Sequence, residues 1–132
     1  MATNRKEDRV EVFYPELSYR IVGLAFDVHN ELSQFAREKQ YADSLEEKFK
    51  VENLTYEREF RIGDSGNIVD FIVGDNKEIL VELKTTRLLG RAHFRQMQNY
   101  LQQTHIKLGL LINFSDKYLS PKRVLLTGVN HS

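Results

Sequence analysis

The sequence predicts a single α/β domain in which a mixed β-sheet is flanked by helices, in the element order ααβββαββ. Two stretches with helical spacing of apolar residues come first, and three short runs rich in β-forming residues follow. A further helical stretch then separates the third run from a fourth. The chain has 132 residues, 41% of them hydrophobic, which suits one domain with one core. We expect residues 1–13 to form a flexible charged tail and residues 14–132 to form the domain.

Two helices are predicted in the first third of the chain. Apolar residues recur at steps of three and four over residues 15–32, which predicts the first helix. Residues 36–50 place apolar side chains at steps of four along one face and charged side chains along the other. The second helix is expected there.

Three strands are expected next. Residues 55–62, 68–73 and 78–84 are rich in β-forming residues, and turn signals separate them at 64–67 and 74–76. Runs this short, joined by loops this short, predict a three-stranded antiparallel meander.

One helix and two strands complete the prediction. Residues 89–103 are expected to form the helix, and residues 106–114 are a nearly continuous apolar run, typical of a strand covered on both faces. Residues 122–127 are expected to form a short fifth strand. Because a helix joins the third strand to the fourth, we expect a right-handed crossover that makes these two strands parallel.

The composition excludes several kinds of site. There is no cysteine, so disulfides, thiolate nucleophiles, cysteine-ligated zinc and iron–sulfur clusters are excluded. The histidines show no metal-ligand spacing; they are His29, His93, His105 and His131. No apolar run approaches the roughly 20 residues of a membrane helix, and no secretory signal follows the polar first residues, so we expect a cytoplasmic protein.

The zero net charge hides an asymmetry. Residues 83–132 contain eight basic residues and one acidic residue (+7), and residues 1–82 contain eleven basic and eighteen acidic residues (−7). The basic half can form a face that attracts a polyanion, or the halves can intermix in space and cancel. The charge distribution alone does not decide between these two arrangements.

Polar residues interrupt two of the apolar strands. Asp70 lies within the second strand, and Glu82 and Lys84 lie at the end of the third, on the same face because side chains alternate along a strand. Burying such groups costs several kcal/mol each unless they are paired or hold a metal ion. Paired carboxylates beside an ammonium can bind a hard divalent cation and activate water. Alternatively, Asp70 is a capping or ion-paired residue and the other two form a surface pair.

The loop between the second and third strands decides whether Asp70 shares a face with Glu82. A two-residue turn would place the two carboxylates on opposite faces, a three-residue loop would place them on one face, and a five-residue loop would set them directly opposite. We therefore predict an odd-length loop or a bulge, with Gly74 or Asn76 at positive φ.

The spacing Asp70, eleven residues, then Glu82-Leu83-Lys84 resembles the PD-(D/E)XK motif of restriction-endonuclease-like nucleases, although Val69 stands where the motif has proline. Over most of its length the chain is similar to the GxxExxY family of that superfamily. The similar blocks are residues 16–32, 79–84, 96–101 and 108–114. The resemblance implies a restriction-endonuclease-like core.

The resemblance also implies roles for individual residues. Asp70, Glu82 and the backbone carbonyl of Leu83 would bind the metal ion, Mg²⁺ with Mn²⁺ as a substitute, and Lys84 would orient or deprotonate the attacking water. Glu38, followed by Tyr41, matches the Glu-x-x-Tyr half of the family signature and would complete the metal shell. Gln96 and Tyr100 match a Gln-x-x-x-Tyr pattern whose face can point at the site.

One departure from the family pattern affects the helical acid. Phe35 occupies the position of the signature glycine, which makes the placement of Glu38 uncertain, and Glu38 can equally be a solvated helix residue. Glu31 is an alternative acid on the first helix. Gln96 and Tyr100 can equally be structural residues.

Three arginines recur every four residues at or before the third helix and are expected to contact phosphate or to form a solvated face: Arg87, Arg91 and Arg95. Between Arg91 and Arg95 lies His93, which is expected to be a solvated helix residue more readily than a phosphate ligand.

Together these features predict a divalent-metal-dependent nuclease acting on nucleic acid, with DNA favoured over RNA. A homodimer is plausible, because cleavage of a duplex needs two sites. The alternative is a catalytically inactive nuclease-fold module that binds nucleic acid or a protein partner.

Overall fold

The computed structural model describes residues 13–128. Within them the elements are α2 (Pro15–Leu32), α3 (Glu38–Val51), β1 (Tyr56–Ile62), β2 (Asn67–Val73), β3 (Ile79–Lys84), α4 (Arg91–Thr104), β4 (Leu108–Asn113) and β5 (Lys122–Leu125). This confirms the predicted order. The predicted tail, apart from Phe13, lies outside the described residues.

The five strands form one sheet in the order β1-β2-β3-β4-β5. Strands β1, β2 and β3 pair antiparallel, which confirms the meander. Strand β4 pairs parallel to β3 along its whole length, and β5 pairs antiparallel to β4. The parallel pairing predicted from the intervening helix is therefore confirmed.

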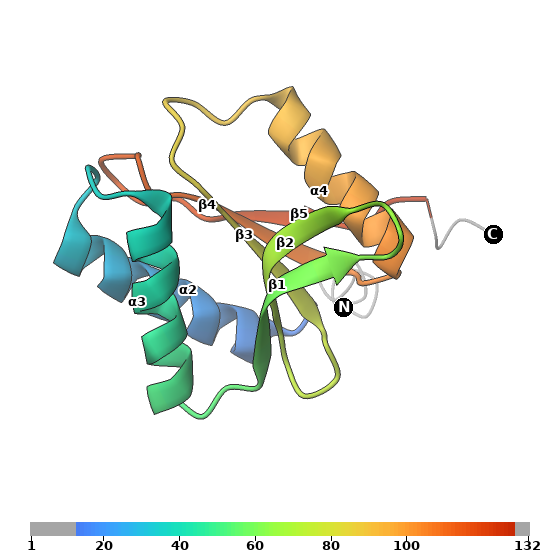
Figure 1. The fold of residues 1–132 in the computed structure, drawn as a ribbon, viewed down its shortest axis with the longest axis horizontal. Helices are drawn as coiled ribbons and strands as arrows, with labels where there is room; N and C mark the ends of the chain where they lie inside the picture. Colours follow the sequence, from blue (N-terminus) through green and yellow to red (C-terminus); the bar gives the residue numbers. More distant parts are fainter. Residues whose placement is uncertain (1–12, 129–132) are drawn as a thin grey trace, which may run out of the picture.

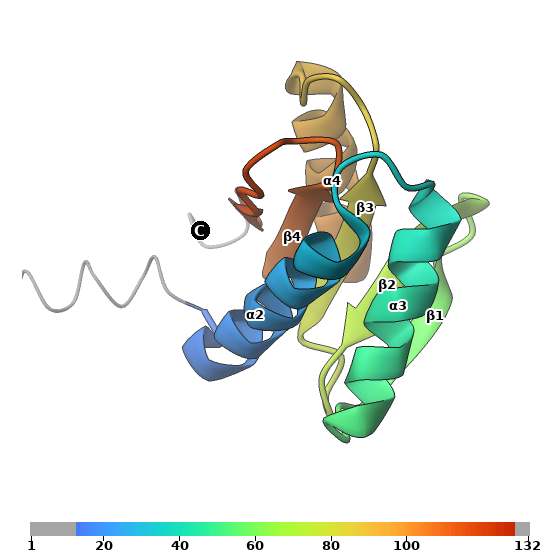
Figure 2. The ribbon, with the colours of Figure 1, turned by 90° about the vertical axis from the view of Figure 1, so that its left-hand side faces the viewer.

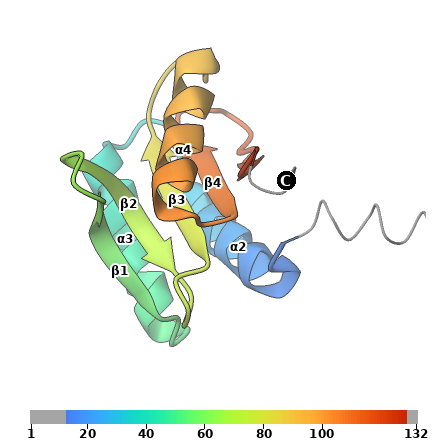
Figure 3. The same cartoon turned by 90° about the vertical axis from the view of Figure 1, so that its right-hand side faces the viewer.

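The helices cover both faces of the sheet, which gives three layers (Figure 1 and Figure 3). Helices α2 and α3 pack on one face through a buried cluster that includes Ile21, Val28, Leu45, Phe49, Phe71 and Val81. Helix α4 packs on the other face through a second cluster that includes Ile72, Leu80, Met97, Tyr100 and Leu111. The strands β3 and β4 are buried on both faces, as a continuous apolar run predicts.

Element ends differ from the prediction where side chains hold the backbone. Helix α3 begins at Glu38, two residues late, because the Gln40 side chain accepts the N–H of Arg37 (2.8 Å) and caps the helix there. Strand β5 ends at Leu125 because Gln98 of α4 bonds the Leu125 carbonyl (2.5 Å) and the Thr127 N–H (3.2 Å).

Among the described residues, the helices are all too short or too polar to cross a bilayer.

Candidate active site

Two carboxyl groups meet where β2 and β3 separate. Backbone pairing between these strands ends at Phe71 and Val81. One residue farther along the register, the N–H of Asp70 donates to Glu82 Oε1 (3.0 Å) and the N–H of Leu83 donates to Asp70 Oδ2 (2.6 Å). The two carboxyls thus replace the backbone acceptors of a regular ladder. One oxygen of each is held by the backbone, so their positions are fixed.

The loop before β3 places Asp70 opposite Glu82. Val73 pairs with Ile79, so the loop has five residues, 74–78. Gly74 has φ +120°, a conformation that favours glycine, and a Cβ there would come within 3.1 Å of the Glu78 backbone nitrogen. The prediction of an odd-length loop with Gly74 at positive φ is confirmed.

Burial makes both carboxyls weaker acids than usual. Burial, followed by the charge of Asp70, raises the pKa of Glu82 to about 7, although the Lys84 ammonium opposes the shift. Burial also raises the pKa of Asp70, against the hydrogen bond from Leu83 and the charge of Lys84. Such a pair favours a bound proton or cation at neutral pH.

Lys84 lies beside the pair and is held from the other side by α4. Its Nζ is 3.3 Å from Glu82 Oε2 and donates to Gln96 Oε1 at 3.3 Å. Tyr100, one turn farther along α4, is buried, and its pKa is raised by burial and by the charges of Glu82 and Asp70. Gln96 and Tyr100 therefore both face the site.

Glu38 lies at the start of α3, within range of the charges of Asp70 and Lys84. Burial raises its pKa, and so does the charge of Asp70, while the charge of Lys84 lowers it. Glu31, the alternative acid, turns instead to Lys48, with which it forms an ion pair of 2.8 Å.

Phe35 does not displace Glu38. Its side chain is 84% exposed, and it is absent from the residues with positive φ; Ser33 (φ 60°) makes the turn instead. The hydroxyl of the buried Tyr41 donates to the Ser33 carbonyl and accepts the N–H of Ala36 (3.1 Å). Tyr41 therefore fixes the turn that aims Glu38, a role that its spacing from Glu38 alone did not reveal.

The site contains residues that sequence reasoning missed. Arg58 of β1 pairs with Asp43 (2.7 Å) and Glu46 (2.8 Å) of α3, and its charge lowers the pKa of Asp70. Asn113, at the end of β4, bonds both backbone groups of Thr86 just beyond Lys84, at 3.1 and 2.8 Å. Both link segments far apart in the chain, so no local signal marks them.

The arginines of the predicted ridge are exposed, and none of the three forms an ion pair with another described residue. Arg95 lines a hollow of about 370 Å³ with Gln96, Tyr100 and Gln103. Gln96, which contacts Lys84, is the link between this hollow and the carboxylate pair.

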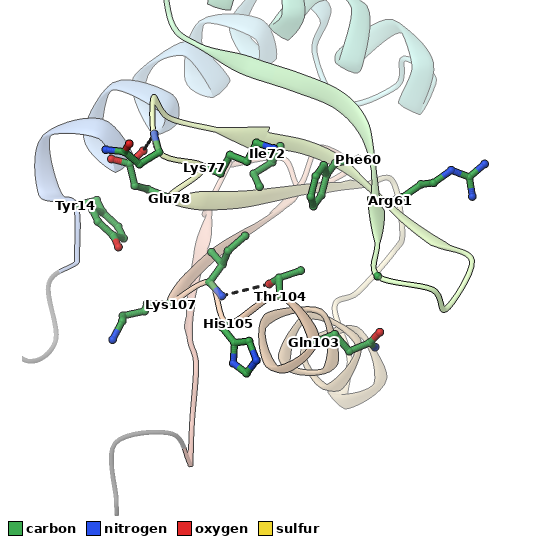
Figure 4. Close-up of a pocket in the computed structure, with 13 residues that line it drawn as sticks. Tyr14, Phe60, Arg61, Ile72, Lys77, Glu78, Gln103, Thr104, His105 and Lys107 are labelled. Carbon is green, nitrogen blue, oxygen red and sulfur yellow. Dashed lines mark hydrogen bonds between the residues drawn. The ribbon is translucent and has the colours of Figure 1, made fainter.

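A larger hollow of about 590 Å³ lies between the β2–β3 loop and the C-terminal end of α4 (Figure 4). Phe60, Lys77, His105 and Lys107 are among the residues that line it, and none of the predicted site residues does.

Two of the described histidines have structural side-chain contacts. His93 Nδ1 accepts the N–H of Gly90 (2.9 Å) and caps α4, and His29 Nε2 bonds the Asp116 carbonyl (2.8 Å). His131 lies outside the described residues.

The donor set suits a hard divalent cation. The buried Glu82 and the half-buried Asp70, both with raised pKa values, and the backbone carbonyl of Leu83 offer only oxygen ligands. The described residues hold no group of three His, Asp or Glu side chains placed to bind one ion. A cation here would have two carboxylate ligands and would keep water, which is how Mg²⁺ is commonly bound.

Comparison with curated proteins and with solved structures found no match. A family model matches residues 15–124, and its description is PD-(D/E)XK nuclease superfamily. The match spans both helices of the first face, the meander, α4 and most of β5. The chain belongs to the PD-(D/E)XK nuclease superfamily.

Proposed function

We propose that this protein is a divalent-metal-dependent nuclease that hydrolyses phosphodiester bonds in DNA. The observation that carries the proposal is the buried carboxyl of Glu82 opposite the half-buried Asp70, with Lys84 beside them, in a chain of the PD-(D/E)XK superfamily. Placing like charges side by side in a low-dielectric environment destabilises the fold, and apolar residues at these positions would make it more stable. The charges are therefore better explained by a function than by stability.

Asp70, Glu82 and the carbonyl of Leu83 would hold Mg²⁺, or Mn²⁺ in its place. The bound ion supplies Lewis-acid stabilisation of a phosphate oxygen. Glu38 lies at the start of α3 and would orient water bound on that side. This assignment is supported by the effect of Asp70 on the Glu38 pKa.

Lys84 would orient the attacking water and stabilise the negative charge that develops on the phosphate. Its ammonium has two partners, Glu82 and Gln96, which hold it near the carboxyls. Gln96 is therefore proposed as a positioning residue for Lys84. Arg91 and Arg95 would contact phosphates on either side of the cleaved bond.

The proposal is tested by incubating the protein with circular single-stranded DNA and circular duplex DNA, in Mg²⁺, Mn²⁺ or EDTA. We expect cleavage of at least one circle in the presence of metal and none in EDTA. Glu82→Gln and Asp70→Asn, which keep the size of the side chains, should abolish it. Cleavage by either variant at the wild-type rate would overturn the site assignment.

Two observations favour a second candidate, a nuclease-fold module without catalytic activity. The described residues contain two clustered acidic ligands rather than three, and Phe35 replaces the signature glycine. A metal titration separates the candidates, because a ligand that binds only the folded state raises the melting temperature. A melting temperature that millimolar Mg²⁺ and Mn²⁺ leave unchanged would favour the inactive module.

A further inference from the structure

Three large apolar side chains are exposed on three different loops around the candidate site. They are Phe35 on the α2–α3 turn, Leu88 on the β3–α4 loop and Tyr118 on the β4–β5 loop, with 84%, 77% and 79% of their surface exposed. Figure 2 shows these three loops together at the upper end of the view. Neighbouring loops that each expose a large apolar side chain can together form a contact surface.

Side chains tie the three loops to one another. Asn113 Nδ2 donates to the Thr86 carbonyl (2.8 Å) and to Asp116 Oδ1 (3.2 Å), which links the β3–α4 loop to the β4–β5 loop. Gln34 Nε2 donates to the Ser115 carbonyl (3.4 Å), which links the α2–α3 turn to the β4–β5 loop. The loops therefore present their apolar side chains in a fixed arrangement.

The same loops border the candidate catalytic residues. The N–H of Phe114 donates to the Lys84 carbonyl (2.8 Å) at the start of both the β3–α4 and β4–β5 loops. Glu38 directly follows the α2–α3 turn and is close enough to Asp70 to feel its charge. A chain segment bound at the carboxylate pair would pass these loops.

The charge of the loops indicates which kind of partner they can bind. Each loop carries one exposed basic residue: Arg37, Arg87 or Lys117. Asp116 is the one acidic residue within the three loops, and it is half-buried and bonded to Asn113. A surface that combines apolar side chains with cations can bind a polyanion that also has flat apolar groups. A nucleic-acid strand with unpaired bases is such a polyanion.

From this we infer that Phe35, Leu88 and Tyr118 form a contact surface for unpaired bases, so that the substrate class of the site is DNA with a single-stranded segment at the cleaved phosphate. The inference rests on the proposed function, because it places a DNA strand at the carboxylate pair. Phe35 and Tyr118 stack on bases, and Leu88 packs against a neighbouring base. Paired bases in a duplex cannot offer these faces.

The test uses the absence of tryptophan from the chain. Phe35→Trp and Tyr118→Trp each introduce a single tryptophan whose fluorescence is quenched when it stacks on a base. Tyr19→Trp is the matched control, because Tyr19 is 80% exposed on the first turns of α2, far along the helix from the α2–α3 turn. The probes are a single-stranded oligonucleotide, a relaxed closed circular duplex that has neither unpaired bases nor ends, and an abasic strand with the same charge as the oligonucleotide. All are used in EDTA so that nothing is cleaved.

We expect the single strand to quench tryptophan at positions 35 and 118 but not at position 19, and the abasic strand and the duplex to quench none of them. Phe35→Ala and Tyr118→Ala should each weaken binding of the single strand about tenfold and leave binding of the duplex unchanged. Equal quenching by the abasic strand, or no quenching at 35 and 118, would overturn the inference.

Two further outcomes separate the inference from the proposed function and from a protein interface. Quenching without cleavage in Mg²⁺ would support the base-contact surface and contradict the nuclease. Cleavage without quenching would support the nuclease and contradict the base-contact surface. A tryptophan emission that shifts with protein concentration in the absence of DNA, together with a dimer in sedimentation, would show that a second copy covers the loops and would overturn the inference.

Discussion

The carboxyl of Glu82 combines a pKa of about 7 with a hydrogen bond from the Asp70 N–H and an ammonium 3.3 Å away. In an unfolded chain the same carboxyl has its ordinary value of 4.5. Between these two values the folded protein holds a proton that the unfolded chain has released. Metal-free protein should therefore lose unfolding free energy as pH rises from about 4.5 to about 7, and keep a lower, level value above that.

Glu82→Gln should remove most of that dependence. The amide carries no charge, so the variant should gain on the order of 3 kcal/mol over wild type at pH 8 and little at pH 4.5. Urea denaturation in EDTA at several pH values measures the unfolding free energy of the variant and of wild type. Equal pH dependence in variant and wild type would show that Glu82 keeps an ordinary pKa in the fold.

Lys84→Ala should separate catalysis from metal binding. An ammonium cannot be a cation ligand, so calorimetry should find Mn²⁺ affinity kept or increased in the variant. Cleavage should fall by roughly 10²-fold or more, because the group that orients water is gone. Loss of Mn²⁺ binding in Lys84→Ala would contradict the role proposed for this residue.

At the scale of elements, the β2–β3 loop sets the register on which the site depends. Gly74→Ala should destabilise the protein by about 1–3 kcal/mol, because the φ of +120° strains a residue with a Cβ and the Cβ would crowd the Glu78 backbone nitrogen at 3.1 Å. The register of Asp70 against Glu82 should loosen with it, so the rise in melting temperature on adding Mn²⁺ should shrink.

Gly23→Ala is the matched control for that substitution. Gly23 lies inside α2, and no atom lies within 4 Å of the position that a Cβ would take there, so alanine should stabilise the helix by roughly 0.5–1 kcal/mol. A melting temperature lowered equally by both substitutions would mean that Gly74 has no special role.

Local patterns were sufficient to predict most elements but not every end. Helix α2 was predicted at its observed bounds, since its apolar spacing begins at Pro15 and stops at Leu32. The start of α3 was missed because a Gln40 side chain, rather than a standard capping residue, ends the preceding turn. An odd loop before β3 was predicted, but three and five residues were equally compatible with its sequence; pairing of Val73 with Ile79 selects five.

At the scale of the whole molecule, the basic residues of the second half should govern DNA binding. Arg91→Gln with Arg95→Gln should lower the slope of log Kd against log salt by about 2 for duplex DNA, because two phosphate contacts are lost. Arg20→Gln with Lys50→Gln removes the same charge near the far end of α3 and should leave the slope unchanged. Fluorescence anisotropy in EDTA measures both. An identical slope in both double variants would mean that α4 does not face the phosphates.

Long-range contacts explain what sequence reasoning could not supply for the site. The face shared by Asp70, Glu82 and Lys84 follows from strand alternation and register, so it was predictable. The contact of Asn113 with Thr86 spans 27 residues, and that of His29 with Asp116 spans 87. Contacts of this kind arise only when helices and sheet pack, and they leave no periodic trace in the chain.

The pairing of β4 along all of β3 has a consequence for the order of events during folding. Because β3 is buried on its second edge only when β4 docks, the carboxyl pair reaches its low-dielectric surroundings late. A chain emerging from the ribosome would therefore be unable to bind a cation during most of its synthesis. The hydrolytic site would form only after β4, which ends at residue 113, has paired with β3. Stopped-flow refolding should show Mn²⁺ uptake no earlier than the recovery of native tyrosine fluorescence.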